Sequence, residues 1–341
     1  MTTTHQLPLP VRVAPAIGLW FVAPLTAEFL MGNIPITDVV AVISTTFIYG
    51  AGALVIREVA RRTGRGWPSI LAWALAYGIF EEAVFTQTLW NENWANVRIL
   101  DYGYVPALGT GVPWLMFMVG VHTIWSISAP IAVVEALAGS RRTTPWLGKT
   151  GLRVVSAVFV LFFVLGGVAK AMLEGWLASP VQYVGAGVLV VALIVLGLRL
   201  RRGGPTVEGA VEVAVPGPWA VFAFALVAGA IFVLLYACDP TGLSPWLAVL
   251  SVPAWLSVLL YLVLFAGVGA LVTRWSHRSG WSDAHRLALA AGAVLTYAWH
   301  SFPWKVISIF PVSPAVDLTS NAIMTVGAVV LLVFAARRVA A

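Results

Sequence analysis

Long apolar stretches recur along the whole chain and are separated by shorter polar segments. A helix rises 1.5 Å per residue, so about 20 apolar residues cross the hydrocarbon core of a bilayer. We predict transmembrane helices over residues 14–31, 36–56, 68–90, 113–138, 152–173, 180–198, 218–237, 246–272, 286–302 and 317–336. The pattern therefore predicts an all-α, polytopic integral membrane protein with about ten transmembrane helices in a single transmembrane domain, residues 1–341.

The connection between the sixth and seventh stretches has a different composition from the others. Residues 199–217 include Gly203, Gly204 and Pro205 and then an acidic, valine-rich run with two more prolines. This composition is typical of a flexible linker. We therefore expect two halves, 1–198 and 218–341, joined by a cytoplasmic linker.

The basic residues indicate how the helices are oriented. All but three of the 20 Lys and Arg residues fall on alternate connections or near the two ends of the chain, and the exceptions are Arg98, Lys170 and Lys305. Because Lys and Arg concentrate on the cytoplasmic side of membrane proteins, we expect both termini to be cytoplasmic. The expected location is the cell (plasma) membrane, and the expected partner is the lipid bilayer.

Composition excludes several classes of protein. Hydrophobic residues make up 60% of the chain and charged residues 10%, whereas soluble domains carry about 25% charged residues. The net charge of +6 is explained by arginines facing anionic lipid, so no nucleic acid is expected as a partner. A single cysteine, Cys238, excludes an internal disulfide framework and a cysteine-based zinc cluster.

Two consecutive acids, Glu81 and Glu82, stand in the middle of the third apolar stretch. A carboxylate inside a membrane helix costs roughly 2.5–3.5 kcal/mol on insertion scales, so the pair indicates a functional site. Neighbouring helical residues point about 100° apart, and the two carboxylates are therefore not expected to face one point. Glu81 shares a helical face with Tyr77, and Glu82 shares one with Thr86.

Two histidines are predicted at a similar depth to the acid pair. His122 lies in the fourth stretch, four residues before Ser126 and on the same helical face, and His300 lies in the ninth. We expect a polar cavity that opens to the outside. An open zinc site would take Glu82, His122 and His300 as its ligands. Glu135, near the inner end of the fourth stretch, is expected to pair with arginines.

The catalytic candidates are Glu81, Glu82 and His122. The candidate substrate contacts are Tyr77, Thr86, Ser126 and Trp94, the last in the polar connection 91–111. The residues leave three substrate classes open: a membrane peptide, a lipid and a small polar solute.

The acid pair followed about forty residues later by a histidine on the next helix resembles the CPBP family, the type II CAAX-protease-like, abortive-infection-related intramembrane proteases. Their motifs are EExxxR, FxxxH and a further histidine followed by Asn or Asp. Here Thr86 stands at the arginine position and Met118 at the phenylalanine position, and His300 is far downstream. The resemblance covers residues 68–138 and implies that Glu81 activates water while His122 helps to form the site.

Three functions remain open from the residues. The first is an intramembrane, metal-dependent hydrolase or protease that uses Glu81 or Glu82 with His122. The second is a proton- or cation-coupled transporter in which the same residues titrate or bind the ion. The third is a membrane protein without catalysis.

Overall fold

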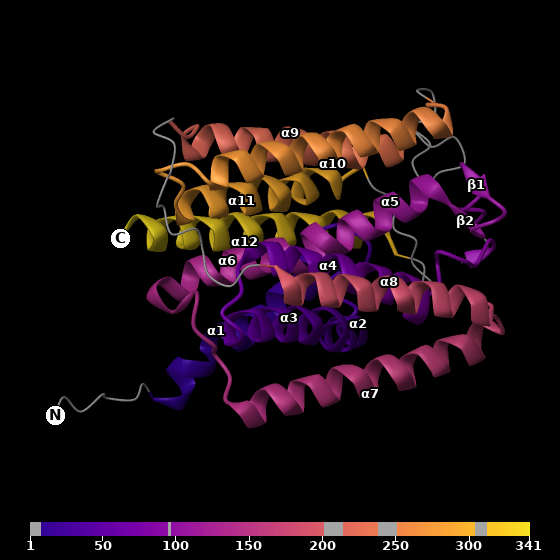
Figure 1. The fold of residues 1–341 in the computed structure, drawn as a ribbon, viewed down its shortest axis with the longest axis horizontal. Coiled ribbons are helices and arrows are strands. Elements are labelled where there is room, and N and C mark those ends of the chain that lie inside the picture. The colour runs from indigo at the N-terminus through magenta and orange to yellow at the C-terminus, as the bar shows by residue number, and fades with distance from the viewer. Residues whose placement is uncertain (1–7, 95–96, 201–213, 238–250, 304–311) are drawn as a thin grey trace.

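Long helices that run roughly along one direction make up most of the molecule (Figure 1). The computed structural model describes residues 8–94, 97–200, 214–237, 251–303 and 312–341. Its α-helices are α1 (Leu9–Pro24), α2 (Val39–Thr45), α3 (Ala51–Arg62), α4 (Trp67–Phe80), α5 (Val112–Val121), α6 (Ala129–Ala138), α7 (Lys149–Glu174), α8 (Pro180–Arg199), α9 (Pro218–Ala237), α10 (Ala254–Ser276), α11 (Asp283–His300) and α12 (Pro314–Ala340). Cys238, Lys305 and most of the predicted linker lie outside the described residues.

Short π-helical segments extend or join several of these helices. They are η1 (Leu25–Phe29), η2 (Thr46–Gly50), η3 (Glu81–Phe85) and η5 (His122–Ser128), and a 3₁₀ turn, η6 (Gly139–Arg141), follows α6. With these segments included, continuous helices run from Val39 to Arg62, from Trp67 to Phe85 and from Val112 to Arg141. Each corresponds to one predicted transmembrane stretch, with ends that differ by a few residues.

The predicted all-α membrane architecture is confirmed. Within the described residues, nine helices are long and apolar enough to cross a membrane. The ninth predicted stretch, 286–302, corresponds to α11, an 18-residue helix that is not among those nine helices. Most of α11 is buried against α9, α12 and α6, so its polar residues meet other helices instead of lipid.

The two ends of the bundle differ. The chain termini lie at one end, and the small hairpin of β1 (Tyr104–Val105) and β2 (Thr110–Gly111) lies at the other (Figure 1). The strands pair antiparallel, with Tyr104 opposite Gly111. The polar connection 91–111 was not predicted to contain strands, because two-residue strands leave no periodic pattern in a sequence.

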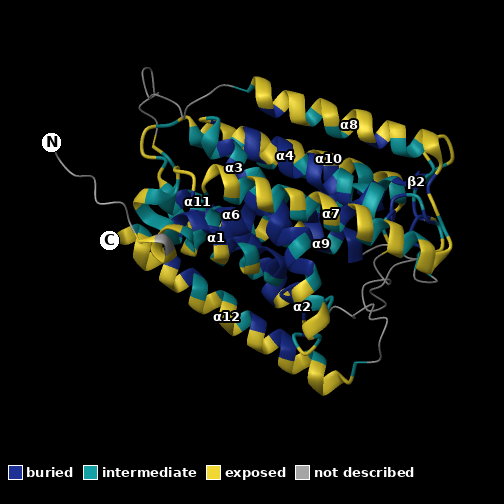
Figure 2. Ribbon diagram, turned by 90° about the horizontal axis from the view of Figure 1, so that it is seen from below, coloured by how far each residue is buried: buried dark blue, intermediate teal, exposed yellow. Residues whose placement is uncertain are grey.

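The outer helices carry exposed apolar residues, and the buried residues lie at the centre of the bundle (Figure 2). Leu161, Val184 and Leu262 are examples of large apolar side chains that remain exposed on α7, α8 and α10. Such a surface suits lipid, which presents no polar partners. One core cluster joins residues from both predicted halves, and Trp125 Nε1 donates to the Ala293 carbonyl at 2.7 Å.

Charged side chains are buried together at the end of the bundle that carries the termini. Glu135 accepts hydrogen bonds from Arg57 at 3.0 Å and from Arg61 at 2.5 Å, as the sequence predicted. Arg57 also pairs with Glu58 at 2.7 Å, and its guanidinium lies 3.4 Å from the centre of the Trp146 ring. Because each buried charge has partners, this network holds α3, α6 and the loop before α7 together.

Candidate functional site

Glu81, Glu82 and His122 lie together in the interior of the bundle. His122 Nε2 is 2.7 Å from a Glu82 oxygen and 3.2 Å from a Glu81 oxygen. The exposed fractions are 1% for each glutamate and 4% for the histidine. The two π-helical segments η3 and η5 supply these residues, and Gly78 on α4 allows the close approach, since a Cβ there would lie 3.0 Å from His122 Cβ.

Both carboxylates face the imidazole, so the expectation that they would point to different places is wrong. The reason is the π-helical turn, in which the Thr86 N–H donates to the Glu81 carbonyl, five residues earlier, at 2.9 Å. This wider turn reduces the angle between consecutive side chains. Its presence depends on contacts with neighbouring helices, which the residue pattern does not record.

The Glu82 carboxylate is held more firmly than that of Glu81. In addition to His122, it accepts hydrogen bonds from the Thr88 hydroxyl and from the Thr86 hydroxyl, the latter at 3.1 Å. Trp114 Nε1 in turn donates to the Thr88 oxygen at 3.2 Å. The Glu81 carboxylate has a longer contact with His122 and a 3.4 Å contact with Thr86. Glu81 is therefore the freer of the two carboxylates.

The imidazole of His122 is oriented by groups on three helices. Its Nδ1 lies 3.1 Å from the Ser126 hydroxyl, one turn along η5. The Tyr77 ring meets it edge-on with centroids 6.0 Å apart, while the Tyr77 hydroxyl donates to the Ile48 carbonyl. Tyr49 stacks on the other side with ring centroids 5.8 Å apart. These contacts direct Nε2 toward the two carboxylates.

A third carboxylate is connected to the cluster and was not among the predicted site residues. Tyr49 donates a hydrogen bond to Glu28, and Asn33 donates to the other Glu28 oxygen at 3.0 Å. The signal available in the sequence was an acid, Glu28, near the end of the first apolar stretch. Tyr49 carried no such signal, because an aromatic residue in a membrane helix is common.

The four π-helical segments share one property. Each carries a polar residue of this cluster: Glu28 on η1, Tyr49 on η2, the acid pair on η3, and His122 with Ser126 on η5. Single π turns are rare within α-helices and are found frequently at functional sites. Their convergence on one group of polar side chains marks this as the candidate site.

His300 does not join the cluster, which corrects the predicted ligand set. The metal-ligating atoms that lie within 4.8 Å of one another in the described residues are those of Glu81, Glu82 and His122. His300 ends α11, and its ring lies beside those of Tyr297 and Trp299. Tyr297, one turn earlier, occupies the contact between α11 and η5 by stacking on Trp125, with ring centroids 4.6 Å apart.

Trp94 also lies outside the helical segments that carry the cluster. It is half-buried in the connection before the hairpin, where its backbone N–H donates to the Asn91 carbonyl at 3.2 Å. The same connection carries a polar pair, in which the Tyr104 hydroxyl donates to Glu92 at 2.9 Å, and this hydrogen bond raises the pKa of Tyr104. Of the four predicted substrate contacts, only Tyr77, Thr86 and Ser126 touch the acid pair or His122.

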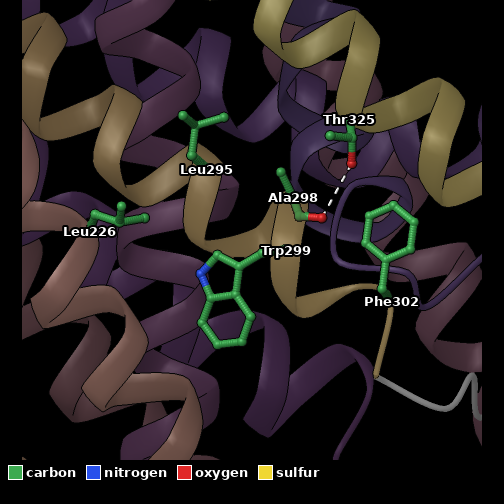
Figure 3. A pocket seen from close by; sticks show the side chains of 6 residues that line it. All are labelled: Leu226, Leu295, Ala298, Trp299, Phe302 and Thr325. Carbon is green, nitrogen blue, oxygen red and sulfur yellow. Dashed lines mark hydrogen bonds between the residues drawn. The ribbon is translucent and has the colours of Figure 1, made fainter.

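The cluster is enclosed, so the expected polar cavity open to the outside is not present around it in the described part of the chain. A surface pocket of about 380 Å³ lies elsewhere, between α9, α11 and α12 (Figure 3). Its lining is apolar except for Thr325, whose hydroxyl donates to the Ala298 carbonyl at 3.2 Å. This pocket suits an acyl chain better than a polar substrate.

The donor set has a defined chemical capacity. Two carboxylates and one imidazole nitrogen are the oxygen and nitrogen ligands that zinc accepts, and three protein ligands leave a fourth position for water or substrate. When His122 carries its proton on Nδ1, this N–H donates a hydrogen bond to the Ser126 hydroxyl oxygen. The other ring nitrogen, Nε2, is then free to bind a metal. The same groups, without a metal, can accept and return a proton.

Comparisons with known proteins place the chain in a family. No curated protein and no solved structure matches it. A family model described as "Uncharacterized membrane protein family" matches residues 19–341, which run from the last part of α1 to the C-terminus. The chain therefore belongs to this membrane protein family.

Proposed function

We propose that this protein is an intramembrane hydrolase in which Glu81 activates a water molecule beside Glu82 and His122. The observation that carries the proposal is the convergence of both carboxylates on His122 Nε2, at 3.2 Å and 2.7 Å, inside a membrane bundle. The partial resemblance of the acid pair and His122 to the CPBP proteases supports it. A membrane peptide is the substrate class that this resemblance favours.

The roles follow from how firmly each group is held. Glu81, with fewer hydrogen bonds, takes a proton from water as the water oxygen attacks the peptide carbonyl carbon. The same proton then passes to the leaving amine as the C–N bond breaks. Glu82, fixed by Thr86 and Thr88, holds the imidazole in place. His122 is then positioned to stabilise the charge that develops at the site.

A divalent cation fits the charge balance of the site. Two buried carboxylates face one imidazole, so the site carries excess negative charge unless a proton or a metal offsets it. We propose zinc as that metal, with Glu82 and His122 as its ligands, so that Glu81 stays free to take the proton from water. When bound, zinc would polarise the carbonyl group and favour the ionised form of water.

Hydrolysis is tested by identifying new protein termini. Membranes from cells that express the wild-type chain, Glu81→Gln or His122→Ala are compared by terminal-peptide mass spectrometry. Cleavage products within membrane segments are expected with the wild type and at least about 100-fold less with either variant. Glu174→Gln, in an exposed ion pair with Lys170, is the control and should cleave normally. An identical set of termini for all four chains contradicts the proposal.

Zinc is tested separately on the purified protein. Elemental analysis should find about one zinc per wild-type chain and markedly less in His122→Ala and Glu82→Gln. Equal elution of all chains on size-exclusion chromatography serves as the folding control. If the wild type cleaves membrane segments but contains no zinc, the hydrolase proposal stands and the zinc proposal is wrong. The two proposals can therefore fail independently.

The enclosure of the cluster favours one other function, a proton-coupled transporter, because buried acids that exchange protons are common in such proteins. Liposomes that contain the protein and an internal pH-sensitive dye separate the two functions. Under our proposal, a membrane potential drives no proton entry. Proton entry that is lost in Glu81→Gln and Glu82→Gln would favour transport.

A further inference from the structure

A second polar region lies at the end of the bundle that carries the termini, where α3 ends and α7 begins (Figure 1). A cavity of about 560 Å³ opens there. Its lining consists of four basic residues and two apolar ones: Arg61, Arg62, Lys149, Arg153, Pro145 and Leu152. None of these residues belongs to the Glu81, Glu82 and His122 cluster.

The cavity carries uncompensated positive charge. Glu135 forms ion pairs with both Arg57 and Arg61, and Glu58 lies 3.6 Å from Arg62. These two carboxylates therefore pair with three arginines. Lys149 and Arg153 form no ion pair with any described residue. Five basic groups therefore face two acids, which leaves an excess of three positive charges at the cavity.

Hydrogen-bond donors are also available there. Lys149 and Arg153 are exposed and lie in the cavity lining, so their side chains can donate to a bound group. α7 begins at Lys149 without a side-chain cap, so the N–H groups of its first turn are free to bind an acceptor. A helix N-terminus combined with basic side chains favours a phosphoryl anion.

The surroundings indicate what carries that anion. The surface of α7 beyond the cavity is apolar and exposed, with Val154 at 55% and Leu161 at 58% exposure (Figure 2). Acyl chains can lie along this surface while a headgroup occupies the basic end, next to Leu152 and Pro145. A free phosphate would use the charges but gain nothing from the apolar surface.

We propose that this cavity binds the phosphodiester headgroup of an anionic glycerophospholipid. Basic pockets between helices at the cytoplasmic side of membrane proteins suit such headgroups. Lys149 and Arg153, one helical turn apart, contact the headgroup, and Arg61 and Arg62 add positive charge to the cavity lining. The site does not depend on the proposed hydrolase.

Native mass spectrometry of the detergent-purified chain tests the site, with dioleoyl-phosphatidylglycerol, dioleoyl-phosphatidylcholine and inorganic phosphate as separate probes. The double variant Lys149→Gln/Arg153→Gln is compared with Lys170→Gln, at the opposite end of α7. Both Lys149 and Arg153 are exposed, so the double variant is expected to fold. Phosphatidylglycerol should bind the wild type and Lys170→Gln equally, and the double variant roughly 10- to 30-fold more weakly.

Each other outcome overturns the assignment. Equal binding of phosphatidylglycerol and phosphatidylcholine would show that charge is not recognised. Unchanged binding by the double variant would place the lipid elsewhere. Inorganic phosphate that binds as tightly as phosphatidylglycerol, with the same dependence on Lys149 and Arg153, would identify a soluble phosphate site in place of a lipid site.

Discussion

At the scale of single residues, the contribution of a buried polar group to the stability of the fold depends on its hydrogen-bond partners. Thr88 and Thr110 are both almost fully buried, at 3% and 2% exposure. The Thr88 hydroxyl donates to Glu82 and accepts from Trp114, whereas the Thr110 hydroxyl has no hydrogen-bond partner in the described residues. A buried hydroxyl that joins a network stabilises it, and an unpaired one costs free energy.

Replacing Thr88 and Thr110 by valine should therefore have opposite consequences. Thr88→Val removes a partner of a buried carboxylate and should lower the free energy of unfolding by about 1–3 kcal/mol. Thr110→Val removes an unpaired hydroxyl of the same size and should be neutral or stabilising. Reversible unfolding in mixed micelles measures both. Equal losses would mean that Thr88 contributes packing alone.

The buried ion network makes a second prediction at this scale. Glu58 accepts hydrogen bonds from Arg57 at 2.7 Å and from the Trp146 backbone N–H at 2.7 Å. Glu58→Gln removes one of the two carboxylates that pair with the buried Arg57 and should destabilise the protein by about 3–5 kcal/mol. Asp101→Asn breaks an exposed pair with Arg98 and should change the free energy of unfolding much less. The same unfolding measurement compares them, and equal effects would contradict this reasoning.

At the scale of elements, the site depends on how closely two helices approach. A Cβ at Gly78 would lie 3.0 Å from His122 Cβ and 3.3 Å from the Val119 carbonyl oxygen. The chain then leaves η3 at Gln87, a non-glycine residue with φ of 58° whose side chain accepts from the Ala178 N–H at 2.9 Å. The acid pair is therefore fixed on both sides: at Gly78 by α5 and η5, and at Gln87 by the connection that precedes α8.

Gly78→Ala should separate α4 from η5 and shift His122 relative to the acid pair. We expect reduced zinc content and cleavage while the size-exclusion profile stays that of the folded protein. Gly185→Ala on α8, where a Cβ would meet nothing within 4 Å, is the matched control and should leave both unchanged. Normal zinc content in Gly78→Ala would show that the helix spacing is not limiting.

At the scale of the whole molecule, the two ends of the bundle have different chemistry. The basic residues of α3, the loop before α7 and the C-terminus lie at the end with the termini, and the hairpin lies at the other (Figure 1). The positive-inside pattern assigns the basic end to the cytoplasm. This orientation is a prediction with a direct test.

Cysteine labelling tests the orientation. Cys238→Ser removes the single native thiol, and one cysteine is then introduced at Leu108 in the hairpin turn or at Thr143 before α7; both positions are exposed. A membrane-impermeant maleimide on intact cells should label Leu108→Cys, and should label Thr143→Cys only after permeabilisation. The reverse pattern would place the termini outside.

Much of the fold could be predicted from local pattern alone. Nine of the apolar stretches became helices long enough to cross a membrane, because the need to satisfy backbone hydrogen bonds in lipid leaves few alternatives. α11 was identified as a stretch, but its buried position could not be predicted from its composition. The hairpin was missed, and the division into two halves stays a prediction, since one core joins them.

The sequence by itself determined that the chain is a helical membrane protein and that Glu81, Glu82 and His122 are unusual in it, because charge in an apolar helix is visible without any structure. Only the tertiary structure decided that both carboxylates meet one imidazole, that Tyr49 and Glu28 join them, and that His300 does not. The reason is physical: π-helical turns and helix spacing are set by contacts between distant segments, and these contacts leave no periodic signal along the chain.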